Sequence, residues 1–257
     1  MPELLTAIIL AIIQGITEWL PISSSGHLVI AQKLLNYQNS LVFDVALHFG
    51  TLMSVFVYFG KDITNIFQDI VKFKFHSENS KLGFYILLSA IPAAIAGYLL
   101  RNIMDTIFNT LPIVAVSFGI TGLLLIITSL NLNKLNKKLN AKKSLIIGTA
   151  QIISLLPGVS RSGTTTSAGI LLGLNEKTAL KFSFLMSIPV IFGANILEIG
   201  NQKLPIEFLW ATLTAFIVGL ITIHLLYRYI LTSRKNLRYF GIYALVLSLI
   251  LLISLFI

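Results

Sequence analysis

The 257-residue chain has no cysteine and very little charge. Without cysteine the fold cannot depend on a disulfide, and catalysis by a thiolate is excluded. Only 11% of the residues are charged, whereas 56% are hydrophobic and the mean hydropathy is +0.87. A soluble domain of this size needs a polar surface, which ten acidic and nineteen basic residues cannot supply. The composition therefore excludes a soluble globular protein and predicts an all-α polytopic membrane protein.

Fifteen of the nineteen lysines and arginines lie in clusters between the apolar stretches, within residues 61–81, 134–143, 177–181 and 228–238. Because positively charged loops stay in the cytoplasm, we place all four clusters there. The net charge of +9 is then explained by membrane orientation, and we expect no nucleic acid as a partner. Apolar spans of suitable length follow at about 41–59, 84–100, 112–130, 182–199, 208–227 and 240–257.

Two further segments do not fit as single spans. Segment 144–172 begins and ends beside cytoplasmic lysines, so it cannot cross the membrane an odd number of times. It is too short for two full spans and carries PGVSRSG in its middle. We predict a re-entrant helical hairpin, whose non-helical tip must be surrounded by protein or by a watery cavity. Segment 4–35, interrupted by PISSSGH, is predicted to be a second hairpin that enters from the outer side, where the N-terminus also lies.

The two hairpins align without a gap at an offset of 137 residues. The alignment pairs Gln14 with Gln151, Ser23 with Ser160, Ser25 with Ser162 and Gly26 with Gly163. Each hairpin is followed by three spans, so residues 1–257 are predicted to form a single membrane domain built as an inverted repeat. The pseudo-repeats are about 1–130 and 144–257, joined by a basic cytoplasmic loop at 131–143, and the site is expected near the midplane where the halves meet.

Arg161 and Glu18 are ionisable residues inside apolar segments. A charge at the bilayer centre costs at least about 2.5–3.5 kcal/mol, so it usually has a functional role, although a purely structural Arg161–Glu18 ion pair is an alternative. SRSG at 160–163 would open a helix with N–H groups, hydroxyls and a guanidinium, which together can bind phosphate. SSSGH at 23–27 offers a similar cradle, with candidate nucleophilic hydroxyls and an imidazole.

Gln14 and Glu18 are four residues apart and project from one helix face as oxygen ligands. Oxygen ligation favours a divalent cation, Mg²⁺ or Ca²⁺, and Mg²⁺ commonly bridges carboxylates to substrate phosphates. The cradle, the metal ligands, a nucleophile and an acid–base group together indicate phosphoryl transfer. A membrane transporter or lipid flippase is the alternative, because inverted repeats and opposed re-entrant hairpins also build transporters.

QGITEWLPISSSGH and LLPGVSRSGTT resemble the two signature motifs of the undecaprenyl-diphosphate phosphatase family of the bacitracin-resistance type. The motifs fall on Gln14, Glu18, Pro21, Ser23, Ser24, Gly26 and His27, and on Pro157, Gly158, Ser160, Arg161, Ser162, Gly163 and Thr165. The resemblance extends to FDVALHFGTL and FSFLMSIPVIFGA. It implies hydrolysis of undecaprenyl diphosphate to the monophosphate carrier of cell-wall synthesis, bacitracin resistance, metal dependence and a fold of inverted repeats. Some members have Glu at the position of Gln14, so this chain has one carboxylate fewer.

These patterns suggest a role for each site residue. Ser24 is the favoured nucleophile and His27, three residues later, its general acid–base, with His27 as nucleophile the alternative. Glu18 would hold the metal with Gln14 or orient His27, and Arg161 would clamp the diphosphate. The expected substrate-binding set is Ser23, Ser25, Gly26, Ser160, Arg161, Ser162, Gly163 and Thr165. We expect the site to face the extracytoplasmic side of the inner (plasma) membrane, with undecaprenyl diphosphate and the bilayer as partners and a homodimer as candidate assembly.

The remaining polar residues are weaker candidates for a functional role. Asp44 and His48 are four residues apart, and we expect a structural or cavity-lining hydrogen bond there rather than catalysis. His224 and Glu198 lie near span ends, where side chains ordinarily reach the membrane interface. KFKFHSENSK, residues 72–81, is predicted to be a solvated cytoplasmic loop.

Overall fold

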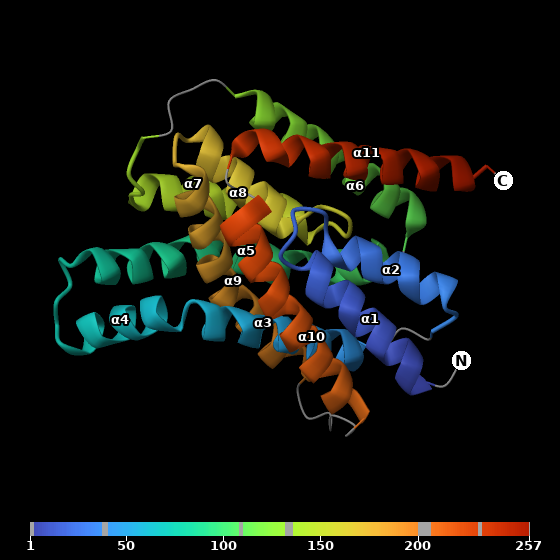
Figure 1. The fold of residues 1–257 in the computed structure, drawn as a ribbon, viewed down its shortest axis with the longest axis horizontal. Coiled ribbons are helices and arrows are strands. Elements are labelled where there is room, and N and C mark those ends of the chain that lie inside the picture. Colours follow the sequence, from blue (N-terminus) through green and yellow to red (C-terminus); the bar gives the residue numbers. More distant parts are fainter. Residues whose placement is uncertain are drawn as a thin grey trace.

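The computed structural model describes residues 3–37, 41–107, 110–131, 136–199, 207–230 and 233–256. Within these ranges the chain is helical and has no strands, which confirms the all-α class (Figure 1). The first half contains α1 (Glu3–Thr17), α2 (Ser24–Leu34), α3 (Leu41–Tyr58), α4 (Gly60–Val71), α5 (Glu78–Ile107) and α6 (Leu111–Leu130). The second half contains α7 (Ala141–Ala150), α8 (Arg161–Leu171), α9 (Glu176–Ile199), α10 (Glu207–Leu225) and α11 (Leu237–Ser254). Single turns of 3₁₀ helix lie at Gln151–Leu155 and Arg234–Asn236, and a π-helical turn at Leu226–Ile230 follows α10.

Five helices in the described part of the chain are long and apolar enough to cross a membrane. They are α5, α6, α9, α10 and α11, at five of the six positions where spans were predicted. The remaining span, predicted at 41–59, corresponds to α3, which meets α4 at an angle of 75°. Together these helices confirm a multi-pass membrane protein. The side chain of Glu198, expected near a span end, lies outside the described residues.

The segment that follows α3 is more helical than predicted. α4 continues to Val71 and α5 begins at Glu78, so the loop predicted at 72–81 is only the turn at 72–77. Asn79 Nδ2 donates to Asp69 Oδ2 at 2.9 Å, which ties the start of α5 to the end of α4. Lys181 Nζ donates to Asp62 Oδ1 at 2.6 Å and fastens α4 to α9. α4 is amphipathic, with Ile63, Ile66, Phe67 and Ile70 at helical spacing, a local signal that the length of apolar runs does not register.

The structure contains two helical hairpins whose tips lie in the middle of the molecule (Figure 1). α1 packs against α2, and α7 packs against α8. These helices contain 15, 11, 10 and 11 residues. A full span needs about 20 residues, so each of them is too short to cross a bilayer alone. Pro21 and Pro157 lie in the interruptions, where proline keeps the preceding residue out of helical geometry. The structure thus contains both hairpins, and the membrane side from which each enters stays a prediction.

Equivalent helices of the two halves make equivalent contacts with the opposite half. α1 packs on α10, while α7, its counterpart in the second half, packs on α5. Likewise α3 contacts α10 and α9 contacts α5. The last helices of the halves, α6 and α11, lie along each other, and Ser248 Oγ donates to the Ala115 carbonyl at 2.7 Å (Figure 1). This reciprocity is consistent with an internal repeat, whose inverted orientation stays a prediction.

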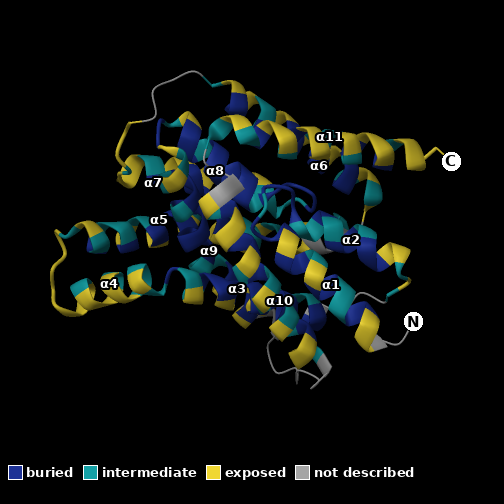
Figure 2. Ribbon diagram, viewed as in Figure 1, coloured by how far each residue is buried: buried dark blue, intermediate teal, exposed yellow. Residues whose placement is uncertain are grey.

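Burial follows the arrangement expected in a bilayer. Dark, fully buried segments gather in the centre, while the outer helices carry exposed residues along their length (Figure 2). Tyr98 on α5, Leu123 on α6 and Leu249 on α11 are exposed apolar side chains of this outer surface. In the centre, Trp19 and Phe184 pack edge to face with 5.1 Å between ring centroids. The outer surface is therefore suited to lipid, and the polar residues of the hairpin tips lie inside.

Candidate active site

The tips of the two hairpins touch at small residues. A Cβ on Gly26 would lie 2.9 Å from Gly158 Cα, and a Cβ on Gly163 would lie 3.3 Å from Pro21 Cβ. The two contacts are equivalent, because Gly26 aligns with Gly163 and Pro21 with Gly158 at the 137-residue offset. A side chain at Gly26 would push the tips apart, so this close approach requires glycine. The contact brings the two signature motifs together.

Both returning helices begin with the same capping arrangement. Ser23 Oγ accepts a hydrogen bond from the backbone N–H three residues later at 3.4 Å, and Ser160 Oγ does the same at 3.0 Å. The hydroxyls of Ser25 and Ser162 each lie 3.2 Å from the capping hydroxyl of their own hairpin. α2 and α8 thus bring two helix N-termini to one place. Their partial positive charges favour an anion between them.

The two caps differ in backbone strain. Ser23 is buried and has φ of +70°, a region that L-residues other than glycine rarely adopt, whereas Ser160 has φ of −70°. Strain of this kind tends to gather at functional sites, where surrounding structure holds it in place. Only the hairpin that carries Ser24 is strained at its cap.

Glu18 is the centre of a polar cluster at the hairpin tips. Its Oε1 lies 2.6 Å from Nη2 of Arg161, an ion pair that joins the first hairpin to the second. Its Oε2 accepts a hydrogen bond from the Ser24 hydroxyl at 2.5 Å and from the Gln14 amide at 3.1 Å. Glu18 is only 8% exposed and Gln14 is fully buried. The structure therefore brings together four residues that were singled out from the sequence.

Arg161 is held by several neighbours besides Glu18. Nη1 donates to the carbonyl oxygen of Ser183 at 3.4 Å, and the guanidinium lies over the Trp19 ring, 5.3 Å from its centroid. Thr165 Oγ1 donates to the Arg161 carbonyl at 2.8 Å and lies 2.6 Å from Ser183 Oγ. Thr165, expected to bind substrate, is thus buried and contacts the Arg161 backbone and Ser183. No sequence pattern had assigned a role to Ser183 or Trp19.

His27 is not paired with Ser24, contrary to the prediction. Its Nδ1 lies 2.6 Å from the Ser23 carbonyl oxygen and its Nε2 lies 2.7 Å from the Tyr243 hydroxyl. The ring stacks on Tyr243 of α11, with centroids 5.7 Å apart. Among the described residues, Glu18 is the only hydrogen-bond partner of the Ser24 hydroxyl, and Glu18 does not orient His27. The spacing was correct for a helical turn, but the Ser23 carbonyl and Tyr243 hold the imidazole away from Ser24.

His48 of α3 lies beside Glu18, although the sequence ranked it low. Its Nε2 is 3.7 Å from Glu18 Oε2, and its Nδ1 is 2.8 Å from the backbone oxygen of Asp44. The Asp44 carboxylate in turn accepts from Gln32 Nε2 of α2 at 2.8 Å. The hydrogen bond expected between Asp44 and His48 is therefore present through the backbone. This hydrogen bond to the Asp44 carbonyl also orients the His48 ring so that Nε2 faces Glu18.

Comparison with known proteins is consistent with this geometry. The family model described as bacitracin resistance protein BacA matches residues 7–250. The chain belongs to this family. Three relatives named undecaprenyl-diphosphatase come from Thermosipho melanesiensis, Korarchaeum cryptofilum and Caldicellulosiruptor bescii. They are 40%, 38% and 40% identical to this chain, over 94%, 97% and 96% of its length and 96%, 98% and 95% of their own.

The two side chains expected to bind a cation in this BacA-family chain, Gln14 and Glu18, lie together. Within the described ranges, no group of three or more His, Cys, Asp or Glu side chains is arranged to hold a metal. Gln14 and Glu18 are nevertheless in contact, and Gln14 Oε1 is buried with no hydrogen-bond partner among the described residues. A buried acceptor without a partner needs an explanation, and a cation beside the carboxylate fits it.

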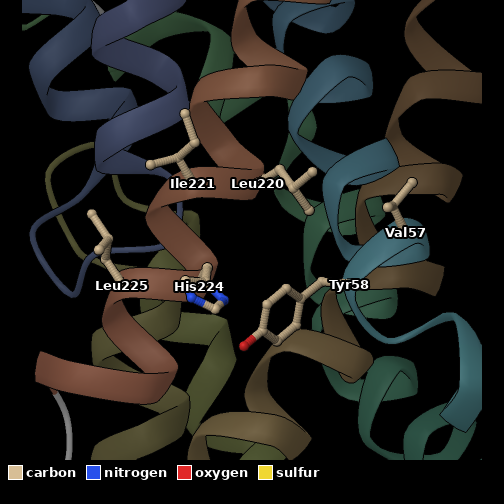
Figure 3. A pocket seen from close by; sticks show the side chains of 6 residues that line it. All are labelled: Val57, Tyr58, Leu220, Ile221, His224 and Leu225. Atoms are coloured by element: carbon tan, nitrogen blue, oxygen red, sulfur yellow. The ribbon is translucent and has the colours of Figure 1, made fainter.

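A hollow of about 450 Å³ lies away from the Glu18 cluster, at neighbouring ends of α3 and α10 (Figure 3). Its lining residues are Val57, Tyr58, Leu220, Ile221, His224 and Leu225. Tyr58 and His224 face each other across it, with ring centroids 6.0 Å apart. None of the predicted site residues lines this hollow. The candidate active site is therefore the polar cluster at the hairpin tips.

Proposed function

We propose that the chain hydrolyses undecaprenyl diphosphate to undecaprenyl phosphate and inorganic phosphate. The observation that carries the proposal is the contact of Glu18 with Ser24 on one hairpin and Arg161 on the other. The names of the relatives supply the substrate, and the apolar outer surface would let its prenyl tail stay in lipid. Such a reaction would recycle the lipid carrier of cell-wall synthesis and confer bacitracin resistance.

Ser24 is the group best placed to attack the terminal phosphorus. Its Oγ donates to Glu18 Oε2 at 2.5 Å, so the carboxylate can accept the proton as Oγ bonds to phosphorus. The bond from that phosphorus to the bridging oxygen breaks, and undecaprenyl phosphate leaves with the oxygen. Water then attacks the phosphoserine, inorganic phosphate departs with the protons of the water, and Glu18 returns its proton to Ser24.

Arg161 would bind the phosphate that is transferred. Its Nη2 faces Glu18 and its Nη1 faces the Ser183 carbonyl, so a diphosphate competes with both for the guanidinium. Phosphate oxygens match the fork geometry of Arg and accept two parallel hydrogen bonds from it. As Arg161 turns toward the phosphate, the Glu18 carboxylate is released from its ion pair and can accept the Ser24 proton. The N-termini of α2 and α8 would stabilise the remaining negative charge.

A divalent cation would bind at the same cluster. Gln14 and Glu18 would hold it, because the Gln14 amide contacts the carboxylate through Nε2 and its Oε1 is buried without a partner in the described chain. When bound, a cation neutralises negative charge on phosphate oxygens. Each carboxylate oxygen has two lone pairs, so Glu18 Oε2 can face a cation and the Ser24 hydroxyl together.

The site would open to the extracytoplasmic side. The start of α1 and the end of α11 lie at one end of the molecule, opposite the lysine-rich α4–α5 turn (Figure 1). Positively charged loops favour the cytoplasm, so the end with the start of α1 would face outward. The first hairpin enters from that end and carries Gln14, Glu18 and Ser24.

Phosphate release by purified protein in detergent tests the proposal. Wild-type protein supplied with undecaprenyl diphosphate should release inorganic phosphate, and Glu18→Gln should release almost none, because the amide cannot accept the Ser24 proton. Glu78→Gln is the matched control, since Glu78 is an exposed residue that pairs with Lys81 at 3.4 Å, far from the hairpin tips. A transporter or flippase without hydrolase activity releases no phosphate, and that result would overturn the proposal.

A further inference from the structure

We propose that His48 is a third ligand of this cation, binding through Nε2, and that the site therefore prefers first-row transition metals to Ca²⁺. The inference deepens the proposed function and rests on it, because the cation is the one held by Gln14 and Glu18. It concerns a side chain on α3, outside both hairpins and both signature motifs.

The geometry of His48 leaves a lone pair facing Glu18. Nδ1 lies 2.8 Å from the Asp44 carbonyl oxygen, which can only accept, so Nδ1 carries the proton. In a neutral imidazole Nε2 is then the acceptor. Nε2 and Glu18 Oε2 lie 3.7 Å apart, beyond hydrogen-bond length. When the imidazole is neutral, Nε2 and Oε2 are two acceptors that face each other, as two ligands of one cation do.

The surroundings of His48 are those of a metal ligand. A ligating histidine almost always donates its other ring N–H to a carbonyl or carboxylate, which fixes the tautomer and the ring orientation. Here the acceptor is the Asp44 carbonyl of the same helix. Asp44 is itself anchored, because its carboxylate accepts from Gln32 Nε2 at 2.8 Å. His48 is therefore aimed at Glu18 before any substrate arrives.

Gln14 is the remaining ligand of the proposed cation, beside Glu18 and His48. Its Nε2 lies 3.1 Å from Glu18 Oε2, while its Oε1 has no partner in the described chain. A half-turn of the amide exchanges these atoms and places the carbonyl oxygen beside Glu18. The other ligand atoms would then lie 3.1 and 3.7 Å from Oε2. Ligands held about 2.1 Å from a metal are about 3.0 Å apart at right angles and about 3.6 Å apart at 120°.

The charge of the cluster explains the metal preference. Ca²⁺ and Mg²⁺ are hard cations that depend on carboxylates and other oxygen ligands. This helix face offers one carboxylate, Glu18, and Arg161 pairs with it at 2.6 Å in the absence of substrate. Imidazole nitrogen instead strengthens binding of first-row transition metals, increasingly from Mn²⁺ to Ni²⁺. A site with one paired carboxylate and one imidazole therefore discriminates against Ca²⁺.

Electron spin-echo envelope modulation tests the ligation directly, because it detects nitrogen bound to a paramagnetic ion. The sample is purified protein in lipid nanodiscs, loaded with Mn²⁺ and methylenediphosphonate. Wild-type protein should show ¹⁴N modulation, His48→Gln should lose it, and His76→Gln should keep it. His76 is the matched control, since it is an exposed histidine of the α4–α5 turn where adventitious Mn²⁺ could bind.

Three spectroscopic outcomes would overturn the inference: no ¹⁴N modulation in wild-type protein, modulation that persists in His48→Gln, or modulation that disappears in His76→Gln. A metal titration adds a second test. His48→Gln should weaken Co²⁺ binding by about tenfold more than Ca²⁺ binding. An equal loss of affinity for Co²⁺ and Ca²⁺ would contradict the proposed preference for transition metals. Nitrogen ligation without phosphate release would leave this inference standing and overturn the proposed hydrolase instead.

Discussion

Glu18 Oε1 and Arg161 Nη2 lie 2.6 Å apart and join the two hairpin tips, although the residues are 143 positions apart in the chain. The side chains are 6% and 15% exposed, so the pair is largely buried. Removing two charges from water is costly, and a buried pair is often no more stabilising than an apolar pair of similar size. Stability alone is therefore a weak reason for this pair, whereas a phosphate-binding arginine and a proton-accepting carboxylate supply a functional one.

Breaking this pair tests whether its role is structural. Arg161→Leu or Glu18→Leu alone leaves a buried charge unpaired and should lower the free energy of unfolding by about 3–5 kcal/mol. The double variant should recover most of that loss yet release no phosphate. Thermal unfolding in detergent and the phosphate assay measure both. The Lys181–Asp62 pair, 31% and 34% exposed, is the control, where Asp62→Asn should cost about 1 kcal/mol or less. A double variant as unstable as the single variants would indicate that the pair holds the tips together.

Arg161→Lys separates charge from geometry. Lysine keeps the positive charge beside Glu18, so the unfolding temperature should change little. It offers one nitrogen in place of a fork, however, and cannot reach Glu18 and the Ser183 carbonyl as Nη2 and Nη1 do. Phosphate release should fall by about 10²-fold or more, the usual cost of losing a donor that stabilises the transition state. Near-normal activity would remove the bidentate clamp from the mechanism.

The sequence predicted the general arrangement because it depends on local and compositional signals. Apolar length located the spans, and the interruptions at PISSSGH and PGVSRSG located the two hairpins. The 137-residue offset paired Ser23 with Ser160, and the structure gives both serines the same capping hydrogen bond. Glu18 and Arg161 were identified because charged side chains are costly inside apolar segments.

Contacts between distant helices could not be predicted in this way. Tyr243 lies 216 positions from His27, and nothing in its neighbourhood marks it as a partner of the imidazole. Ser24 and His27 satisfied helical spacing, yet Glu18 accepts the Ser24 hydrogen bond because the first hairpin folds back at Pro21. His48 carried a usable signal in its spacing from Asp44, but spacing alone could not show that α3 brings it to Glu18.

Gly26→Ala tests the close approach of the hairpins. The added Cβ would lie 2.7 Å from Phe118 Cζ and 2.9 Å from Gly158 Cα, so the tips must move apart. Overpacking of this kind should cost about 1–3 kcal/mol, and phosphate release should fall with it. Gly193→Ala is the matched control in α9, since a Cβ there meets nothing within 4 Å and alanine favours the helix. If Gly26→Ala and Gly193→Ala have the same stability and the same phosphate release, the hairpin tips are not tightly packed.

Impermeant thiol labelling tests the topology without background, because the chain has no native cysteine. Cysteine at Asn36, an exposed residue just after α2, should label from outside intact cells. Cysteine at Lys138 or Lys177, which are exposed residues of the basic clusters, should label only after permeabilisation. Residues 38 and 39 and the side chain of Asp105, also expected outside, lie beyond the described residues. If cysteines at positions 36 and 138 label from the same side of the membrane, the re-entrant first hairpin is contradicted.

Mass spectrometry of acid-quenched enzyme tests the central claim, that Ser24 attacks phosphorus while Glu18 accepts its proton. Purified protein is mixed with undecaprenyl diphosphate, quenched during turnover and digested. The account predicts a phosphoserine at position 24 in wild-type protein and none in Ser24→Ala, with Ser254→Ala, an exposed serine at the end of α11, as the control that still traps it. Phosphate on His27, recovered when the quench is alkaline because phosphohistidine is acid-labile, would contradict the account. So would turnover with no phosphoenzyme under either quench, which would point to direct attack by water.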